Sequence, residues 1–373
     1  MSRGRRSLST TPSAAGSSPE GVALVRVPEP RQTIGMDLFA LTRDLLALDS
    51  TTGREGEVGR LLGDRLRARG YDVTMQEVTP GRWNVYAHHG RPRVVLSTHL
   101  DTVPPYIPPR EDDRRIHGRG ACDAKGIAAA MVAAAEALDR DARRHTGLLF
   151  LVGEETVSDG ARAAAALEPK GEALIGGEPT EGRLATAGRG TLRVRVAIAG
   201  RAAHSSLEGG TDSAIERLLD LLAELRTLDL PRDPELGPTS YNIGTIEGGV
   251  AANVVPPSAE ALLLFRTVET GPGLRRTLED WARDRAQIEF PAEMPPIRFA
   301  VEPGFPTTTI PFGTDLPLLA DWGRRYLIGP GSIRVAHTDG EYVEKKELEA
   351  AAAAYARLAG LCLGRPAHAG RPV

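Results

Sequence analysis

The sequence has little cysteine, no long apolar run and almost no net charge. Cys122 and Cys362 are its only cysteines, which excludes a disulfide framework and favours a reducing, cytoplasmic location. No stretch of about 20 apolar residues occurs, so no helix is expected to span a membrane. A formal net charge of −3 gives no basic field for binding nucleic acid. What remains is an ordinary globular composition, with 41% hydrophobic and 25% charged residues.

The length and a change in pattern predict several segments. A chain of 373 residues exceeds a typical single core, so we expect more than one domain. Residues 1–35 are rich in Ser, Gly, Pro and Arg without apolar periodicity, which predicts a disordered N-terminal tail. Residues 36–190 and 303–373 are expected to form one discontinuous catalytic domain. Residues 191–302 are expected to be a second domain inserted into it.

The pattern from residue 36 onward predicts an α/β fold. Short apolar runs at residues 93–97, 148–152 and 173–176 are typical of buried parallel strands. An Ala-rich helix is expected over residues 126–138. The inserted segment predicts a two-layer α+β unit, a sheet with helices on one face. Its expected strands lie at residues 191–198, 240–247, 259–267 and near 297–302, and its expected helices at 212–225 and 273–284.

Side chains that bind metals follow the three buried strands. His99 follows the first, Glu155 the second and Glu178 the third. The carboxyl ends of strands are where open α/β sheets bind their ligands. Asp123, in a loop of small residues, and His337, near the C-terminus, complete a set of two imidazoles and three carboxylates. This set suits two divalent ions that share one carboxylate.

Each of these residues alone also fits a structural role. His99 is compatible with a buried histidine that makes a local hydrogen bond, and Asp123 with a helix N-cap. His337 is compatible with a histidine in a surface loop. The adjacent Glu154 and Glu155 argue most strongly for cations, because neighbouring carboxylates after an apolar strand repel each other unless positive charge compensates. One of them can bind a metal while the other acts as a base.

These motifs, in this order and spacing, closely resemble the M20 family of metallopeptidases and deacylases from about Met36 onward. The resemblance implies a zinc-peptidase-like domain with a mixed central sheet flanked by helices. It also implies that residues 191–302 are a two-layer lid or dimerisation domain, and that the chain forms a homodimer through it. Two Zn²⁺ ions per subunit are implied, with Co²⁺ as a substitute. The peptide bond between Asp123 and Ala124 is expected to be cis.

The resemblance assigns the metal ligands individually. His99 and Glu178 are expected to bind one ion. Glu155 and His337 are expected to bind the other ion. Asp123 is expected to bridge the two.

The resemblance also assigns residues that do not bind metal. Asp101 is expected to orient His99, and Glu154 to act as the general base. His204, which in this family often comes from the partner subunit, is expected to stabilise the tetrahedral intermediate. The implied substrate contacts are Arg189, Asn253, Arg266, and Gly313 and Thr314 in the loop that they form with Asp315.

The implied activity is hydrolysis of an amide bond. The first expectation is removal of an acyl group from an N-acyl amino acid, specifically deacetylation of N-acetylornithine in arginine biosynthesis. Succinyl-diaminopimelate desuccinylation, release of lysine or ornithine from an amino-group carrier protein, and dipeptidase or carboxypeptidase activity are alternatives. A catalytically silent protein that binds amino acid derivatives is a further alternative, against which the retained Glu154 and ligands argue. The segment 337–342 looks compacted relative to the family pattern, which leaves the substrate open.

Overall fold

The computed structural model describes residues 37–206 and 212–364. The predicted tail, residues 1–35, lies outside the described residues. Both sheets described below belong to one compact unit, Gly35–Val373. Among the helices of the described ranges, none is both long enough and apolar enough to cross a membrane.

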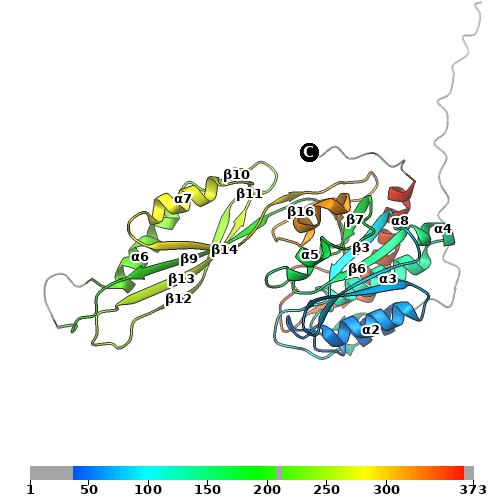
Figure 1. Cartoon of the computed structure of the whole chain (residues 1–373), viewed down its shortest axis with the longest axis horizontal. Coiled ribbons are helices and arrows are strands. Elements are labelled where there is room, and N and C mark those ends of the chain that lie inside the picture. Colours follow the sequence, from blue (N-terminus) through cyan, green and yellow to red (C-terminus); the bar gives the residue numbers. More distant parts are fainter. Residues whose placement is uncertain (1–36, 207–211, 365–373) are drawn as a thin grey trace, which may run out of the picture. The chain divides into compact units, whose positions relative to one another are not determined.

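The first sheet has six strands and is mixed (Figure 1). Four neighbouring strands run parallel, the next strand pairs antiparallel with them, and the edge strand beyond it pairs antiparallel in turn. In spatial order the strands are β1 (Asp72–Thr79), β2 (Arg82–His88), β6 (Thr146–Leu151), β3 (Val94–His99), β7 (Ala173–Gly176) and β17 (Arg324–Leu327). Every residue of β3, β6 and β7 is buried, as the apolar runs in the sequence predict.

Helices cover both faces of this sheet. Neighbouring residues of β3 point in opposite directions, so that Leu96 packs in one hydrophobic core and Val95 in another. The first core contains side chains from α1 (Leu38–Leu46), α2 (Gly56–Arg67), α3 (Lys125–Ala137) and α8 (Lys345–Leu363). The second contains side chains from α5 (Asp159–Ala164) and the 3₁₀ helix η2 (Leu316–Trp322). The short α4 spans Arg140–Arg144. The central strands of this sheet are therefore enclosed on both sides.

The second sheet is antiparallel and is covered on one face. In spatial order its strands are β12 (Ser240–Gly248), β13 (Ser258–Thr267), β9 (Gly190–Ala199) and β14 (Gln287–Met294). Helices α6 (Ala214–Glu224) and α7 (Gly273–Ala282) lie along one face and share its core (Figure 1). The alternation of buried and more exposed residues in β9 and β13 matches this arrangement. The 3₁₀ helix η1 (Leu225–Thr227) follows α6.

The strand expected at residues 297–302 does not close the second sheet. That position is taken by β14, while β15 (Ile297–Arg298) pairs with β8 in a separate small sheet. Ile288 and Phe290 alternate with polar residues in β14, but Pro291 lies within a register shift and interrupts the pattern. The small sheets are β15, β8 (Leu184–Gly188) and β16 (Thr307–Ile310); β18 (Tyr342–Glu344), β5 (Arg115–His117) and β4 (Arg110–Glu111); and β10 (Arg232–Asp233) with β11 (Gly237–Pro238).

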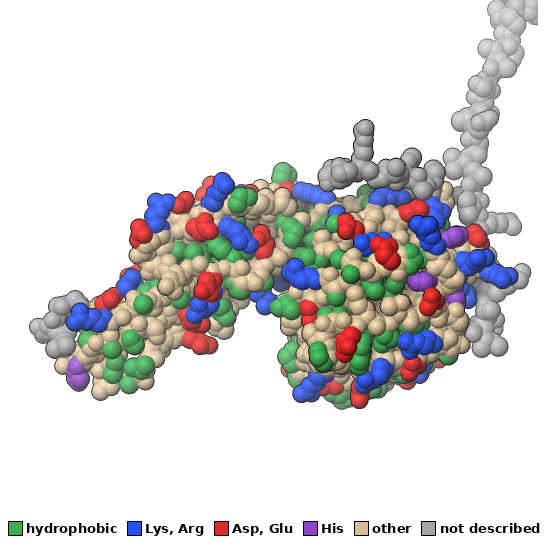
Figure 2. Space-filling model, in the orientation of Figure 1, with side chains coloured by type: hydrophobic (Ala, Val, Ile, Leu, Met, Phe, Trp, Pro, Cys, Tyr) green, Lys and Arg blue, Asp and Glu red, His purple; other side chains and the backbone are tan. Residues whose placement is uncertain are grey.

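Charged side chains of both signs are mixed over the surface shown in Figure 2. Many of them form exposed pairs, such as Arg285 with Glu224 at 2.7 Å and Arg65 with Asp44 at 2.6 Å. Exposed pairs contribute little to stability, because water screens the charges and the long side chains lose freedom. The fold is therefore held by its hydrophobic cores rather than by these pairs.

Candidate functional site

Three neighbouring strand ends bring the predicted ligands together. His99 is the last residue of β3, Glu154 and Glu155 follow β6, and Glu178 follows β7. Strand β3 lies between β6 and β7 and runs parallel to both, so their carboxyl ends meet at one edge of the sheet. This convergence is what the sequence predicted.

The carboxylate of Asp123 lies between two histidines from distant parts of the chain. Its Oδ1 is 3.0 Å from Nε2 of His99, and its Oδ2 is 3.3 Å from Nε2 of His337. Asp123 precedes α3, and its peptide bond to Ala124 is cis, as the resemblance implied. One carboxylate that reaches two imidazoles with different oxygens has the geometry expected of a bridging ligand.

Glu155 completes a compact group of ligand atoms. Its Oε1 is 2.9 Å from Nε2 of His337. His99, Asp123 and Glu155 each offer a ligand atom within 4.8 Å of the others. The structure thus gathers four of the five predicted ligands through direct contacts, and it buries the fifth, Glu178, at the adjoining strand end.

Buried negative charge dominates the surroundings of these residues. Burial raises the pKa of Glu154 well above its usual range, and Glu178 and Asp315 raise it further. Burial likewise raises the pKa of Glu178, with a further contribution from Asp123. Such groups ionise only where positive charge compensates them. The donor set therefore fits divalent cations.

The two histidines respond to the same charge. Hydrogen bonds with Asp123 and Glu155 raise the pKa of His337 to about 10. Burial alone would lower the pKa of His99, but contacts with Asp101 and Asp123 raise it well above its usual range. When both imidazoles are protonated, their positive charge compensates the nearby carboxylates. Bound divalent ions can supply that positive charge in place of the protons.

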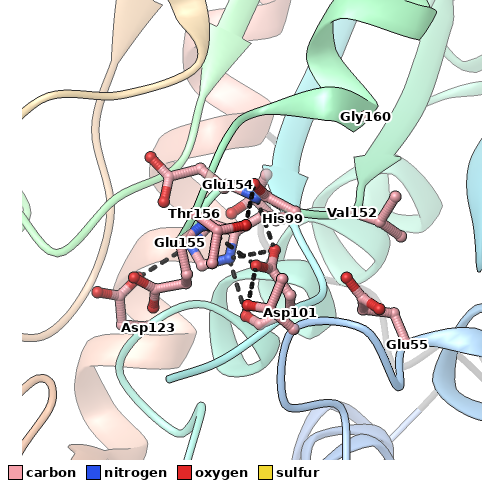
Figure 3. Close-up of polar contacts among 12 residues, drawn as sticks. Glu55, His99, Asp101, Asp123, Val152, Glu154, Glu155, Thr156 and Gly160 are labelled. Atoms are coloured by element: carbon pink, nitrogen blue, oxygen red, sulfur yellow. Dashed lines mark hydrogen bonds and ion pairs between the residues drawn. The ribbon is translucent and has the colours of Figure 1, made fainter. Parts of the chain in front are cut away.

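Asp101 contacts both His99 and the turn that carries Glu154 and Glu155 (Figure 3). Nδ1 of His99 is 2.9 Å from the backbone oxygen of Asp101 and 3.4 Å from its carboxylate. The Asp101 carboxylate accepts hydrogen bonds from the backbone N–H groups of Glu154 at 3.0 Å and Glu155 at 3.1 Å. Thr52 donates a further bond to it at 2.8 Å. Asp101 therefore fixes the backbone from which both glutamates project.

A cavity of about 420 Å³ opens onto this cluster. That volume suits a small molecule or a short peptide. Its acidic side is formed by residues at the strand ends of the six-stranded sheet, and the four-stranded sheet contributes guanidinium groups, with the predicted contacts Gly313 and Thr314 also in the lining. The acidic side comprises Asp123, Glu154, Glu155 and Glu178, with His337 beside them.

Arg193 and Arg266 line the cavity from the four-stranded sheet, as does Glu293 of β14. Arg162 of α5 also contributes to the lining. Arg193 on β9 lies opposite Leu264 on β13, which is two residues before Arg266. Both arginines therefore lie on the same face of the sheet, diagonally across the two strands. Within the described ranges, neither makes an ion pair or a side-chain hydrogen bond. Burial and the neighbouring arginines lower the pKa of Arg266, while Glu154 raises it. An anionic group in the cavity would stabilise both charges.

Sequence reasoning identified Arg266 and named Asp315 within the loop of Gly313 and Thr314, but it missed Arg193. The signal for Arg193 is its place in the alternating pattern of β9, on the side opposite the hydrophobic core. Asp315 lines a smaller hollow with His99 and Glu154, and neighbouring carboxylates add to the burial that raises its pKa to about 7. The raised pKa of Asp315 could not be predicted from the sequence, because the neighbouring carboxylates come from other parts of the chain.

The cavity lining does not include three residues that were predicted to contact the substrate or to stabilise its intermediate. The guanidinium of Arg189 donates hydrogen bonds of 3.1 and 2.6 Å to the backbone oxygen of Leu236. His204 pairs with Val254 in an isolated bridge, beside the exposed Asn253. The structure therefore places His204 and Asn253 together, and it does not bring them into the same cavity as the acidic cluster.

Comparison with protein families gives one extensive match. The model of Peptidase family M20/M25/M40 matches residues 95–360. A Peptidase M20 domain-containing protein of Schizosaccharomyces pombe is 38% identical over 327 residues, covering 84% of this chain and 82% of the relative. A protein of Aspergillus flavus named "Probable carboxypeptidase" is 38% identical over 372 residues, covering 86% of this chain and 89% of the relative.

A solved structure has the same fold. The crystal structure of a tripeptidase from Staphylococcus aureus aligns with a TM-score of 0.74 at 20% identity. The alignment covers 88% of this chain and 98% of the tripeptidase. At this identity the likeness establishes an α/β fold with a mixed sheet and helices, and no more.

Proposed function

Because the chain belongs to peptidase family M20/M25/M40, whose members hydrolyse amide bonds with bound metal, we propose that it releases the C-terminal residue of a short peptide. The observation that carries this proposal is a cavity lined by the carboxylates at the strand ends of the six-stranded sheet and by two arginines of the four-stranded sheet, whose guanidiniums have no partner among the described residues. The relative named as a carboxypeptidase supports it. Deacetylation of N-acetylornithine finds no support in the comparisons, which favour the peptidase alternative.

The metal centre in this proposal consists of two Zn²⁺ ions. His99 and Glu178 would hold one ion, Glu155 and His337 would hold the other, and Asp123 would be shared between them. The raised pKa values of the buried carboxylates support this assignment, because bound cations would favour their ionised forms. When bound, the ions lower the pKa of water and polarise the carbonyl group of the substrate.

Glu154 is the general base in this proposal. It lines the cavity beside the proposed ligands, and its backbone is fixed by Asp101. Its carboxylate accepts the proton of the attacking water and then transfers that proton to the leaving nitrogen. A carboxyl group with a pKa raised by burial is suited to both steps.

Arg266 and Arg193 bind the C-terminal carboxylate of the peptide. A guanidinium group can donate two parallel hydrogen bonds to a carboxylate, which fixes its orientation as well as its charge. Gly313 and Thr314 line the same cavity and contact the residue to be released. The residue to be released then lies between the arginines and the acidic cluster, and the scissile bond lies at the acidic cluster.

Residues 191–302 act as a lid and dimerisation domain in this proposal. His204 and Asn253 lie on this segment but outside the cavity lining, so closure of the lid or a second copy must bring them to the substrate. There His204 stabilises the oxyanion of the tetrahedral intermediate. We therefore propose a homodimer. An amino-group carrier protein as partner stays a prediction from the sequence alone.

A set of three substrates tests the proposal on zinc-loaded protein. They are an N-acetylated dipeptide with a free C-terminal carboxylate, the same dipeptide as its C-terminal amide, and N-acetylornithine. We expect the free acid to be cleaved with kcat/KM roughly 10- to 100-fold above that of the amide, because a charged hydrogen bond is lost. Equal rates for acid and amide, or fastest cleavage of N-acetylornithine, would contradict C-terminal peptide cleavage.

A further inference from the structure

A buried carboxylate outside the proposed ligand set lies directly behind Asp123. Glu341 is 2% exposed. Its Oε1 accepts hydrogen bonds from three backbone N–H groups, those of Gly120 at 3.0 Å, Cys122 at 3.0 Å and Asp123 at 3.1 Å. A single oxygen from a distant segment thus fixes the loop that carries the proposed bridging ligand.

Arg119 neutralises this carboxylate and links it to its own loop. Its Nη1 donates to Oε2 of Glu341 at 2.7 Å and to the backbone oxygen of Thr338 at 3.1 Å. Its Nε donates to the backbone oxygen of Pro105 at 3.2 Å. Arg119 is 1% exposed, so the ion pair is almost entirely removed from water. A buried pair of this kind persists only where further hydrogen bonds satisfy both groups, as they do here.

The loop between these anchors has little freedom to rearrange. Gly120 has φ +90°, a backbone conformation that favours glycine. A Cβ at this position would lie 2.6 Å from Cε of Lys125 and 2.9 Å from Cγ2 of Thr102. The close packing therefore leaves no room for a side chain at position 120, and the three N–H groups that donate to Glu341 fix the backbone of the loop.

His337 and Glu341 lie four residues apart in the segment before β18, whereas Asp123 lies in the loop before α3. We propose that Glu341, held by Arg119, is a positioning residue that fixes Asp123 relative to His337. It thereby sets the separation of the two metal positions. This inference rests on the proposed metal centre, and it adds a residue with no assigned role in that centre. Glu341 does not touch the substrate or the reacting atoms.

A merely structural role for Glu341 makes a different prediction. In that case its loss would lower the stability of the metal-free protein and leave zinc affinity unchanged. A positioning role predicts that zinc affinity falls more than the stability of the metal-free protein does, because the ligands remain but no longer match the geometry of the ion. Residues that hold metal ligands in place commonly change metal affinity by about 10- to 100-fold when they are replaced.

The test compares Glu341→Gln with Glu302→Gln. Both replacements remove the charge of a buried glutamate, but Glu302 accepts a hydrogen bond from Tyr326 on β17 rather than from the loop of Asp123. Zinc dissociation constants are measured by competition with a chromogenic chelator, and thermal unfolding is followed on the metal-free proteins. We expect weaker zinc binding by about 10- to 100-fold for Glu341→Gln alone. The visible absorption spectrum of its Co²⁺ form should also shift.

Several outcomes would overturn the inference. Equal zinc affinity and an unchanged cobalt spectrum in Glu341→Gln would reduce the residue to a structural role. If this variant fails to fold, Arg119→Lys carries the test, since it keeps the charge but loses donors. Wild-type protein that binds no zinc would overturn the metal centre and this inference together. Tight zinc binding without peptide cleavage would overturn only the proposed function.

Discussion

The two sides of the cavity are built in opposite ways. On the acidic side, Asp123 and the backbone of Glu154 and Glu155 are held by hydrogen bonds from other segments. On the basic side, Arg193 and Arg266 project from a sheet face without a bound partner within the described ranges. Fixed geometry suits groups that carry out chemistry, because small displacements cost rate. Unpaired charge suits recognition, because it is satisfied only when the substrate arrives.

The two sheets that carry these groups also differ, in how fully helices cover them. Helices cover both faces of the six-stranded sheet, and its central strands are wholly buried. The four-stranded sheet has helices on one face, and its other face presents Arg193 and Arg266 to the cavity. The comparison implies that changes on the acidic side act mainly on rate and metal affinity. Changes on the basic side should act mainly on the choice of substrate.

Glu154→Gln is expected to have the largest effect on rate. The variant keeps the size of the side chain but cannot accept a proton, so kcat should fall by roughly 10²- to 10⁴-fold. Zinc content, measured by elemental analysis, should stay at the wild-type level. Glu155→Gln is the matched comparison, because it alters a proposed ligand and should lower the zinc content instead. A Glu154→Gln variant with an unchanged rate would remove Glu154 as the base.

Asp101→Asn is expected to have the next largest effect. The Asp101 carboxylate accepts two backbone N–H groups and the hydroxyl of Thr52, whereas an amide presents only one oxygen to these donors. The turn of Glu154 and Glu155 should loosen, with a loss of about 10- to 100-fold in zinc affinity or kcat. Thr52→Val removes one of the donors and should have a smaller effect. Equal effects of both variants would argue against Asp101 as the anchor of the turn.

Much of the acidic side could be predicted from short motifs. The apolar runs before His99, Glu155 and Glu178 predict buried parallel strands, and parallel strands bring their carboxyl ends to one edge. The contact between Asp123 and His337 needs more information, because 214 residues separate them in the sequence. The family resemblance supplied that pairing, whereas local pattern alone also allowed a surface loop for His337.

The basic side and the anchors behind the ligands could not be predicted in this way. Arg193 is one of several arginines in an alternating strand, and only the pairing of β9 with β13 places it beside Arg266. Glu341 gains its role from backbone N–H groups, which have no sequence signature. Pro291 concealed β14 for a similar reason, since the tertiary pairing tolerates a residue that local propensity disfavours.

Arg193→Ala and Arg266→Ala sharpen the comparison on the basic side. Arg266 is half-buried and Arg193 exposed, so the lost charge should matter more at position 266. We expect kcat/KM for the free-acid dipeptide to fall roughly 10- to 100-fold in Arg266→Ala and by only a few-fold in Arg193→Ala. Zinc affinity should stay unchanged in both. A change in zinc affinity would mean that the basic side also supports the metal centre.

Leu278→Ala should have the smallest effect on activity and a large effect on stability. Leu278 is fully buried on α7 beneath the four-stranded sheet, and a cavity of this kind costs about 2 to 5 kcal/mol in the free energy of unfolding. The residue contributes to a hydrophobic core separate from those that contain the catalytic strands. Leu358→Ala on α8 places an equivalent cavity beneath the six-stranded sheet.

Hydrogen exchange on the two leucine variants tests whether the sheets are independent units. If residues 191–302 are a separate domain, Leu278→Ala should increase exchange in β9 and β13 while β3 and β6 stay protected. Leu358→Ala should do the opposite and should also weaken zinc binding. Increased exchange in all four strands of both variants would show a single cooperative unit. The contrast between a rigid acidic side and a separately supported basic side would then have to be abandoned, because any loss of packing would reach both.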